Sequence, residues 1–324
     1  MKIIEWNCQG AFRKKNEQIL SLKPDILIIP ECENEEKLKF DKLTPKPNDF
    51  FWYGDSSNKG IGVFSYSDYK FEILNEFNPK YRYVIPLKVS NKQNSFILFA
   101  IWAMDNKEKK DARYIGQIWL AINYYSDFLI NEKTILIGDF NSNQIWDYKD
   151  RVGNHMDVVR KLEEKQIFSL YHKKYSLEYG NEKDATFYMY RKKEKPYHID
   201  YCFASNKILQ KGFDLEIEKN DNWINFSDHK PMIIELSDNI NQEEILNSLK
   251  KGIESKINII SVQTKEKFTD LIEWILKEAE EFDNNPQKKA IEKQKIIDNF
   301  EMLLEIDKMI ILINKNIVNN SSKK

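Results

Sequence analysis

Five short segments of the sequence place acidic, amide or imidazole side chains directly after runs of apolar residues. These segments are Trp6-Asn7, Pro30-Glu31, Gly138-Asp139-Phe140-Asn141, Ile199-Asp200-Tyr201 and Ser227-Asp228-His229. A short run that is almost entirely apolar is typical of a strand buried on both faces of a sheet. We therefore expect each polar group at the end of a strand, where side chains can converge on one rim of the sheet.

Carboxylates, amides and an imidazole are the groups that phosphodiester hydrolysis requires. A phosphodiester resists attack because its anionic oxygens repel a nucleophile. Cleavage therefore needs a hard cation on those oxygens, an aligned water molecule and a base that deprotonates the water. Hard cations such as Mg²⁺ prefer oxygen ligands, among them carboxylates. Together the five segments indicate a metal-assisted phosphoester hydrolase.

Each segment taken alone has a simpler interpretation. Asp139 and Asn141 are common turn formers after a strand, and Asn7 is a possible cap. Asp228, which precedes a His and lies near a Pro, is equally compatible with turn chemistry. For an isolated Asp-x-Asn the turn interpretation is the more frequent one. The coincidence of five such segments in one chain favours an active site.

The first part of the chain, residues 1–238, alternates short β-rich runs with helical patterns. Runs such as Ile26–Ile29 and Ile135–Ile137 are apolar throughout. Helical patterns cover Lys14–Leu22, Asp111–Ile130 and His155–Gln166. This alternation predicts an α/β sandwich in which mixed sheets are covered by helices.

The pattern changes after residue 238, where the β signals nearly vanish and Lys, Glu, Ile and Asn dominate. Asn241 and Glu244 form a capping pair for one helix, and a long apolar stripe runs from Ile291 to Ile311. We expect a domain boundary here and a helical C-terminal extension over residues 239–324. The stripe must pack against the catalytic domain, the preceding helix or another chain, so self-association or a protein partner is expected.

Composition excludes several other classes of protein. The 324 residues carry 50 Lys+Arg and 51 Asp+Glu, a net charge of −1, which argues against a tight non-specific DNA binder but allows a local basic groove. Three cysteines without C-x-x-C spacing indicate neither a disulfide framework nor a zinc site. The sequence shows no secretory signal, and its longest apolar run, Phe96–Met104, is about half the ~20 residues of a membrane span. A cytoplasmic location without membrane contact is the expectation.

The five segments, in this order, resemble the endonuclease/exonuclease/phosphatase superfamily, which includes the pancreatic-type deoxyribonucleases and the abasic-site endonucleases. The quoted motifs are W-N, a strand-end Glu, G-D-F-N, I-D-Y and S-D-H. The resemblance covers residues 1–238. It implies a DNase I-like fold, a four-layer sandwich of two packed mixed β-sheets flanked by helices.

The resemblance also implies a metal end of the site. Glu31 would be the principal ligand of Mg²⁺, with Mn²⁺ as a possible substitute, and Asn7 would lie beside it. Asp228 would be a second carboxylate on the metal side. Gln9 stands where some abasic-site endonucleases have an Asp, which argues against a second metal.

The remaining motif residues receive catalytic roles from the resemblance. Asp139 would orient or deprotonate the attacking water, and Asn141 would hold the water or a phosphate oxygen. His229 would donate to the scissile phosphate, while Asp200 would fix the tautomer of the imidazole and raise its basicity.

Five further residues are candidates for substrate contact, each with a simpler alternative. Trp102 stands where many members of the superfamily have a His or Tyr, and could stack on a base or be a buried aromatic. Arg113 and Tyr114 begin a helix and could meet a phosphate or be a solvated helix start. His155 follows the G-D-F-N loop, and His198 takes the place of an Arg that often precedes I-D-Y.

The most economical function is a nuclease acting on DNA or RNA. The plentiful aromatic residues, such as Trp146 and Tyr148, and the basic residues Arg191-Lys192-Lys193 and Lys195 suit a nucleic-acid surface. The alternative is hydrolysis of a smaller phosphoester, such as a nucleotide, an inositol phosphate or a phospholipid headgroup, which the near-zero net charge favours. A catalytically impaired binding protein is the third possibility, and the completeness of the motif set argues against it.

Overall fold

Two six-stranded sheets form the centre of the computed structural model, which describes residues 1–107 and 109–237. The expected helical extension, residues 239–324, lies outside the described residues. The first sheet contains β1 (Lys2–Glu5), β2 (Ile26–Cys32), β3 (Asp49–Ser56), β4 (Lys59–Ser65), β13 (Phe213–Ile217) and β14 (Met232–Leu236). The second contains β5 (Lys70–Ile73), β6 (Val84–Ser90), β7 (Ser95–Trp102), β8 (Thr134–Asp139), β9 (Ile167–Ser169) and β12 (Asp200–Ser205). A separate two-stranded ribbon joins β10 (Phe187–Tyr188) and β11 (Pro196–Tyr197).

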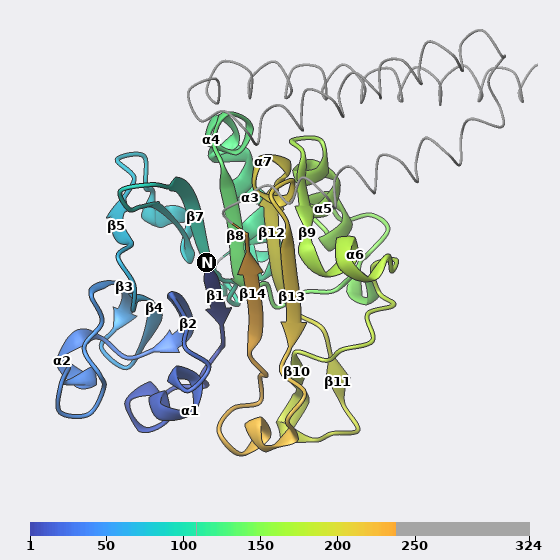
Figure 1. Cartoon of the computed structure of the whole chain (residues 1–324). Helices are drawn as coiled ribbons and strands as arrows, with labels where there is room; N and C mark the ends of the chain where they lie inside the picture. The colour runs from blue at the N-terminus through green and yellow to red at the C-terminus, as the bar shows by residue number, and fades with distance from the viewer. Residues whose placement is uncertain (108, 238–324) are drawn as a thin grey trace, which may run out of the picture. The chain divides into compact units, whose positions relative to one another are not determined.

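Helices are short and lie outside the sheets (Figure 1). The α-helices are α1 (Asn16–Leu20), α2 (Glu35–Leu38), α3 (Ile115–Tyr124), α4 (Ser126–Asn131), α5 (His155–Glu163), α6 (Leu170–Tyr175) and α7 (Asn206–Leu209). The 3-10 helices are η1 (Phe12–Lys14), η2 (Pro79–Tyr81), η3 (Lys110–Ala112), η4 (Gln144–Trp146), η5 (Met189–Arg191) and η6 (Asp221–Asn225). None of the helices in the described ranges is long and apolar enough to cross a membrane.

The strand order of the first sheet is β13-β14-β1-β2-β4-β3, and that of the second is β5-β6-β7-β8-β12-β9. The pairs β1–β2 and β7–β8 are parallel and the remaining neighbours are antiparallel, so both sheets are mixed. Figure 1 shows β14, in orange, beside β1, in dark blue. Because Glu5 lies opposite Met232, the segment that leads into β14 reaches the same end of the sheet as Asn7.

Alternating side chains of the central strands fill separate cores. Ile3 of β1 packs between the two sheets, whereas its neighbour Ile4 packs under η1 and α1, with Phe12 and Ile19. In β8, Ile135 faces the other sheet. A third core joins the opposite face of the second sheet to α3 and α5. Successive strand residues point to opposite faces, so strands covered on both sides must be apolar throughout, as the sequence predicts. The four-layer arrangement of helices, two sheets and helices is therefore confirmed.

The boundaries of several elements differ from the sequence-based expectation. The expected helix over Asp111–Ile130 is divided into η3, α3 and α4, and the break at Tyr125 coincides with a tertiary contact in which the buried Tyr125 hydroxyl accepts from the backbone N–H of Asn78 (3.0 Å). The β-rich run of residues 186–190 forms only the two-residue strand β10, because Tyr190 adopts a left-handed φ of 59°. Both differences arise from long-range packing and turn geometry that local periodicity does not encode.

Candidate active site

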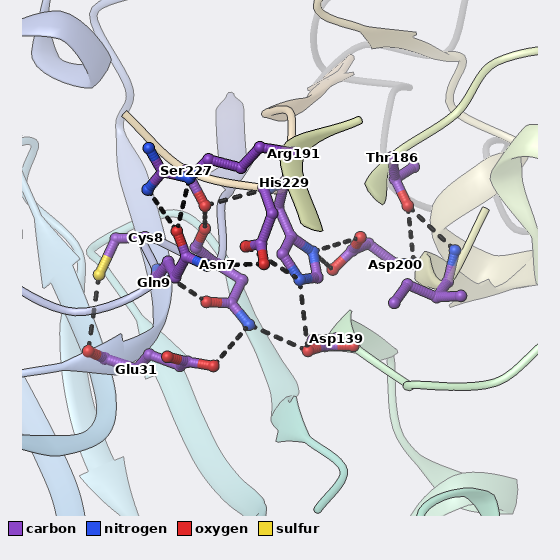
Figure 2. Close-up of polar contacts among 12 residues, drawn as sticks. Asn7, Cys8, Gln9, Glu31, Asp139, Thr186, Arg191, Asp200, Ser227 and His229 are labelled. Carbon is purple, nitrogen blue, oxygen red and sulfur yellow. Dashed lines mark hydrogen bonds and ion pairs between the residues drawn. The ribbon is translucent and has the colours of Figure 1, made fainter. Parts of the chain in front are cut away.

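The motif residues lie together at the ends of β1, β2, β8 and β12 and in the loop before β14 (Figure 2). Gly138 is necessary for this geometry. It has a φ of 145°, and a Cβ at its position would lie 1.9 Å from the carbonyl oxygen of Ile101 on β7. Only glycine allows β7 and β8 to approach so closely immediately before Asp139.

Asp139, Asp200 and His229 form the buried centre of the site. Asp200 lies directly opposite Asp139 in the antiparallel β8–β12 ladder. The Nδ1 atom of His229 is 2.9 Å from Oδ2 and 3.1 Å from Oδ1 of Asp200. Its Nε2 atom faces Oδ2 of Asp139 at 4.0 Å and Oδ1 of Asp228 at 4.0 Å. The Asp200 carboxylate accepts this hydrogen bond, so Nδ1 carries a proton and Nε2 is the ring nitrogen that faces Asp139 and Asp228.

Burial and mutual charge perturb this centre strongly. Burial, followed by the charge of Asp200, raises the pKa of Asp139 to about 8. Burial lowers the pKa of the His229 imidazole, but the charge of Asp200 and the hydrogen bond with it, followed by the charge of Asp139, raise it to about 10. The raised pKa favours the charged form of His229, which partly offsets the negative charge of the neighbouring carboxyl groups. Such opposed groups are typical of catalytic acid–base sites.

Two amides hold Asp139 in place. Asn7 donates from Nδ2 to Oδ2 of Asp139 (3.0 Å), and Asn141 donates to the same oxygen (2.9 Å) and to the carbonyl of Ala103 (2.8 Å). The Asn141 backbone N–H donates to Oδ1 of Asp139 (2.8 Å). Asn7 Nδ2 also lies 3.5 Å from Oε1 of Glu31, so Asn7 bridges the two carboxylates. The Oδ1 atom of Asn7 accepts from the N–H of Gln9 (3.0 Å). For Asn7 to act as the predicted metal ligand, its side-chain amide would have to rotate so that Oδ1 takes the place of Nδ2.

Glu31 projects from an irregularity in β2. The pairing of β2 with β4 shifts register between Pro30 and Cys32, and Glu31 has a φ of 61°. This bulge turns the carboxylate out of the sheet and toward the site, which is a common use of a β-bulge beside an active site. The Oε2 atom accepts from Nζ of Lys59 at 2.6 Å.

Asp228 joins the site through a polar chain on its rim. Gln9 donates from Nε2 to Oδ2 of Asp228 (2.7 Å), and its Oε1 accepts from Nε of Arg191 (3.0 Å) and from a second guanidinium nitrogen. Arg191 also donates to the carbonyls of Asn225 (3.2 Å) and Phe226 (3.3 Å). A cationic side chain from the β10–β11 turn is thereby held at the edge of the site (Figure 2).

Several positioning residues were not singled out by the sequence. Ser227 donates from Oγ to the carbonyl of Asn7 (2.6 Å) and accepts from the N–H of His229 (3.1 Å), and Trp6 donates from Nε1 to the His229 carbonyl (3.0 Å). Thr186 Oγ1 accepts from the backbone N–H of Asp200 (3.1 Å). Ser227 and Trp6 belong to the S-D-H and W-N motifs, so these motifs could have identified them as positioning residues. No sequence feature pointed to Thr186.

Glu5 is a further acidic group that the sequence did not indicate. Its side chain is fully buried, and neither carboxylate oxygen has a hydrogen-bond partner among the described residues. Burial, with the nearby charges of Asp200 and Asp139, raises its pKa well above the ordinary value. A neutral Glu5 avoids adding a further negative charge beside the two aspartates.

Three of the predicted substrate contacts lie near the site without touching its centre. Trp102 ends β7 opposite Asp139 but is buried, with its ring 5.2 Å from that of Tyr83. Arg113 pairs with Asp105 at 3.2 Å. Tyr114 is 42% exposed and has a φ of 49° immediately before α3. Of the three, Tyr114 presents the largest free surface.

The other two, His155 and His198, lie in a buried cluster beside the site. His155 is 1% exposed, and its ring lies 4.9 Å from that of Tyr201. His198 donates from Nδ1 to the carbonyl of Asp184 (2.7 Å), and its ring lies 5.0 Å from the same tyrosine. Burial lowers the pKa of both imidazoles. Their observed partners are structural, so the geometry lends no support to substrate contact by either.

The donor set fits a hard divalent cation at the Glu31 end. Glu31 and Asp228 offer carboxylate oxygens that are partly exposed, and Mg²⁺ is usually held by one or two carboxylates. Within the described ranges, Asp139, Asp200 and His229 are the group whose potential ligand atoms all lie within 4.8 Å of one another. Within this group, His229 already uses Nδ1 for Asp200, and the surrounding carboxyl groups raise the pKa of its imidazole, which disfavours the neutral form that binds a metal. The Glu31 end and this buried group are therefore both candidate positions for a cation.

Comparisons with known proteins agree on the fold. No family model and no curated protein sequence matches the chain. Among solved structures, the 3′-5′ exonuclease NExo from Neisseria meningitidis is similar over 73% of this chain and 100% of its own, with 18% identity and a TM-score of 0.51. An AP endonuclease from Archaeoglobus fulgidus is similar over 73% and 99%, with 17% identity and a TM-score of 0.52. The endonuclease domain of TRAS1, a telomere-specific non-LTR retrotransposon, gives 73% and 97%, with 16% identity and a TM-score of 0.50. Residues 1–237 thus have the DNase I-like fold that these solved structures share.

Proposed function

We propose that the protein is a divalent-metal-dependent phosphodiesterase that cleaves nucleic acid. The observation that carries this proposal is the position of His229 between the buried Asp200, 2.9 Å from Nδ1, and Asp139, 4.0 Å from Nε2, with the partly exposed Glu31 at the same end of the sheets. Asp139 can take a proton, and His229 can donate a charged hydrogen bond. Both lie near Glu31, the carboxylate at which we place a hard cation.

The residues divide the work as follows. Asp139, held by Asn7 and Asn141, accepts a proton from the attacking water when its carboxyl group is ionised. His229 directs Nε2–H at an anionic phosphate oxygen, and Asp200 keeps the imidazole in that orientation and charge state. The divalent cation, when bound at Glu31, supplies positive charge to the phosphate oxygens. These contributions are strongest where charge develops in the transition state.

Nucleic acid is the favoured substrate for two reasons. The similar structures are named as an endonuclease, an exonuclease and an AP endonuclease, and a related NExo structure is described as a 3′ phosphatase bound to a product DNA hairpin. In this chain, the turn between β10 and β11 carries Arg191, which contacts Gln9 at the rim of the site, and the further basic residues Lys192, Lys193 and Lys195. Cations at this place suit the flanking phosphates of a polynucleotide. A small phosphoester is the second candidate, which the net charge of −1 favours.

The test is a substrate panel for the purified full-length protein with Mg²⁺ or Mn²⁺. The panel contains duplex DNA, single-stranded DNA, RNA, a nucleotide and bis(p-nitrophenyl) phosphate, and Asp139→Asn serves as the inactive control for contaminating nucleases. Cleavage of a polynucleotide that is lost in the Asp139→Asn protein supports the proposal. Turnover of small phosphoesters without any polynucleotide cleavage would favour the second candidate.

A further inference from the structure

Lys59 forms an ion pair with the principal acidic group of the metal end. Its Nζ atom lies 2.6 Å from Oε2 of Glu31, while Oε1 of Glu31 lies 3.5 Å from the Asn7 amide. The Lys59 side chain is 53% exposed and that of Glu31 is 18% exposed, so the pair faces the open side of the site. A cationic group therefore already occupies the oxygen that a divalent cation would use.

Strand pairing fixes the backbone position of Lys59. Lys59 begins β4 and lies opposite Ser56 in the β3–β4 hairpin, and the next residue, Gly60, pairs with Cys32 beside Glu31. A Cβ at Gly60 would lie 2.4 Å from the carbonyl oxygen of Tyr53, so the two strands approach closely at this point. Lys59 is therefore delivered to Glu31 by paired backbone.

Contacts on the outside of the hairpin hold its tip as well. Asn34 donates from its backbone to the carbonyl of Ser57 (3.1 Å). Arg82 contacts both carboxylate oxygens of Asp55 at 2.8 Å. Lys37 donates to the side chain of Asn58. The hairpin is thus tied to neighbouring elements on either side of Lys59, and its ammonium group can move without moving the backbone.

Electrostatics sets what happens when a cation arrives. A divalent ion at Glu31 and the Lys59 ammonium group repel each other, and both need the same carboxylate. The ion carries the larger charge, so Lys59 is the group that leaves. Its flexible four-carbon stem keeps the released ammonium group close to the site, where a phosphate is the available anion.

We propose that Lys59 occupies the cation position at Glu31 until a divalent cation displaces it, and that the released ammonium group then binds the substrate's phosphate. This inference rests on the proposed function, because it assumes a phosphoester substrate at the same site. It makes binding of the cation and binding of the substrate interdependent through a single lysine. Lys59 thereby becomes a substrate-binding residue in the loaded protein.

Mn²⁺ binding, followed by electron paramagnetic resonance or calorimetry on the full-length protein, tests the first half without reference to activity. Lys59→Met removes the charge and keeps the length, so Mn²⁺ should bind about two- to fivefold more tightly, the range expected for an exposed ion pair. Lys59→Arg should restore the wild-type affinity. Lys37 contacts Asn58 of the same hairpin and not Glu31. Lys37→Met should therefore leave the Mn²⁺ affinity unchanged.

The proposed contact between the released Lys59 and the substrate's phosphate is tested by measuring KM at saturating Mn²⁺. Lys59→Met should raise KM for the cleaved phosphodiester severalfold with a smaller change in kcat, and Lys37→Met should not. Unchanged or weaker Mn²⁺ binding by Lys59→Met, or no Mn²⁺ binding by the wild-type protein, overturns the inference. Tighter Mn²⁺ binding with an unchanged KM overturns the phosphate contact. Hydrolysis by the wild-type protein reports on the proposed function separately, so the two can fail independently.

Discussion

Asp139 and Asp200 lie directly opposite each other in the β8–β12 ladder, and His229 contacts one and faces the other. Like charges in directly opposed positions of a sheet destabilise it. Here both aspartates are buried, where solvent cannot screen their charge. They raise the pKa of the His229 imidazole between them, and its protonated form offsets part of that charge. The geometry that sets up proton transfer is therefore also a source of instability, which makes stability a readout of the site.

Asp200 and His229 should behave as one unit in catalysis. Asp200→Asn and His229→Ala should each lower kcat by about 100- to 1,000-fold, because either change removes the oriented imidazolium. The double variant should be little worse than the worse single variant, since groups acting together are non-additive. Circular dichroism provides the folding control. Effects that multiply in the double variant would show that the two residues act separately.

Asp139→Asn should abolish hydrolysis and yet stabilise the fold. Burial and Asp200 raise the pKa of Asp139 to about 8, so the folded protein binds a proton between about pH 4 and pH 8 that the unfolded chain releases. The wild-type protein consequently loses stability over that interval as pH rises, and the asparagine variant lacks this contribution. The difference in Tm between the two proteins should grow from pH 5 to pH 8 to several degrees. A constant difference across this range would contradict the burial of an ionisable Asp139.

Arg191 should distinguish polynucleotides from small substrates. Its guanidinium group is fixed on Gln9 at the rim, where a flanking phosphate of a polynucleotide would lie. Arg191→Met should raise KM for an oligonucleotide about tenfold and leave bis(p-nitrophenyl) phosphate almost unaffected. Lys88→Met, which removes the charge of an exposed lysine on β6, outside the β10–β11 turn, is the control. Equal losses on both substrates would mean that Arg191 supports the site itself.

The expected helical extension should be separable from the chemistry. Strand β14 ends at Leu236, after the complete set of motif residues. A chain that ends at Ser237 should stay folded and retain hydrolysis of bis(p-nitrophenyl) phosphate. Light scattering should show a smaller assembly than the full-length chain if residues 239–324 mediate self-association. A folded, monomeric but inactive product would instead assign these residues a part in building the site.

The sequence predicted the layers of the fold and the convergence of the motifs because both follow from local patterns. Apolar runs such as Ile26–Ile29 specify strands covered on both faces, and a polar residue at the end of each run marks a rim. The order of the motifs then sufficed to bring Asn7 and Asp139 within hydrogen-bonding distance across 132 residues.

Other features depend on contacts that no local pattern records. Lys59 was one basic residue among 50 until the β3–β4 hairpin placed it on Glu31. Glu5 looked like an ordinary strand residue, although it is fully buried. His155 had a position next to the G-D-F-N loop in sequence, yet its side chain turns into an aromatic cluster. In each case the direction of a side chain was decided by tertiary packing.

The most direct test of the account measures polynucleotide cleavage against Mg²⁺ concentration for the wild-type protein and Glu31→Gln, after removal of metal with EDTA. The wild-type protein should be inactive in EDTA and recover fully with Mg²⁺. Glu31→Gln keeps the size of the side chain but loses its charge, so it should need at least about tenfold more Mg²⁺ or remain inactive. Full wild-type activity in EDTA, or the same Mg²⁺ dependence for both proteins, would contradict a catalytic cation at Glu31.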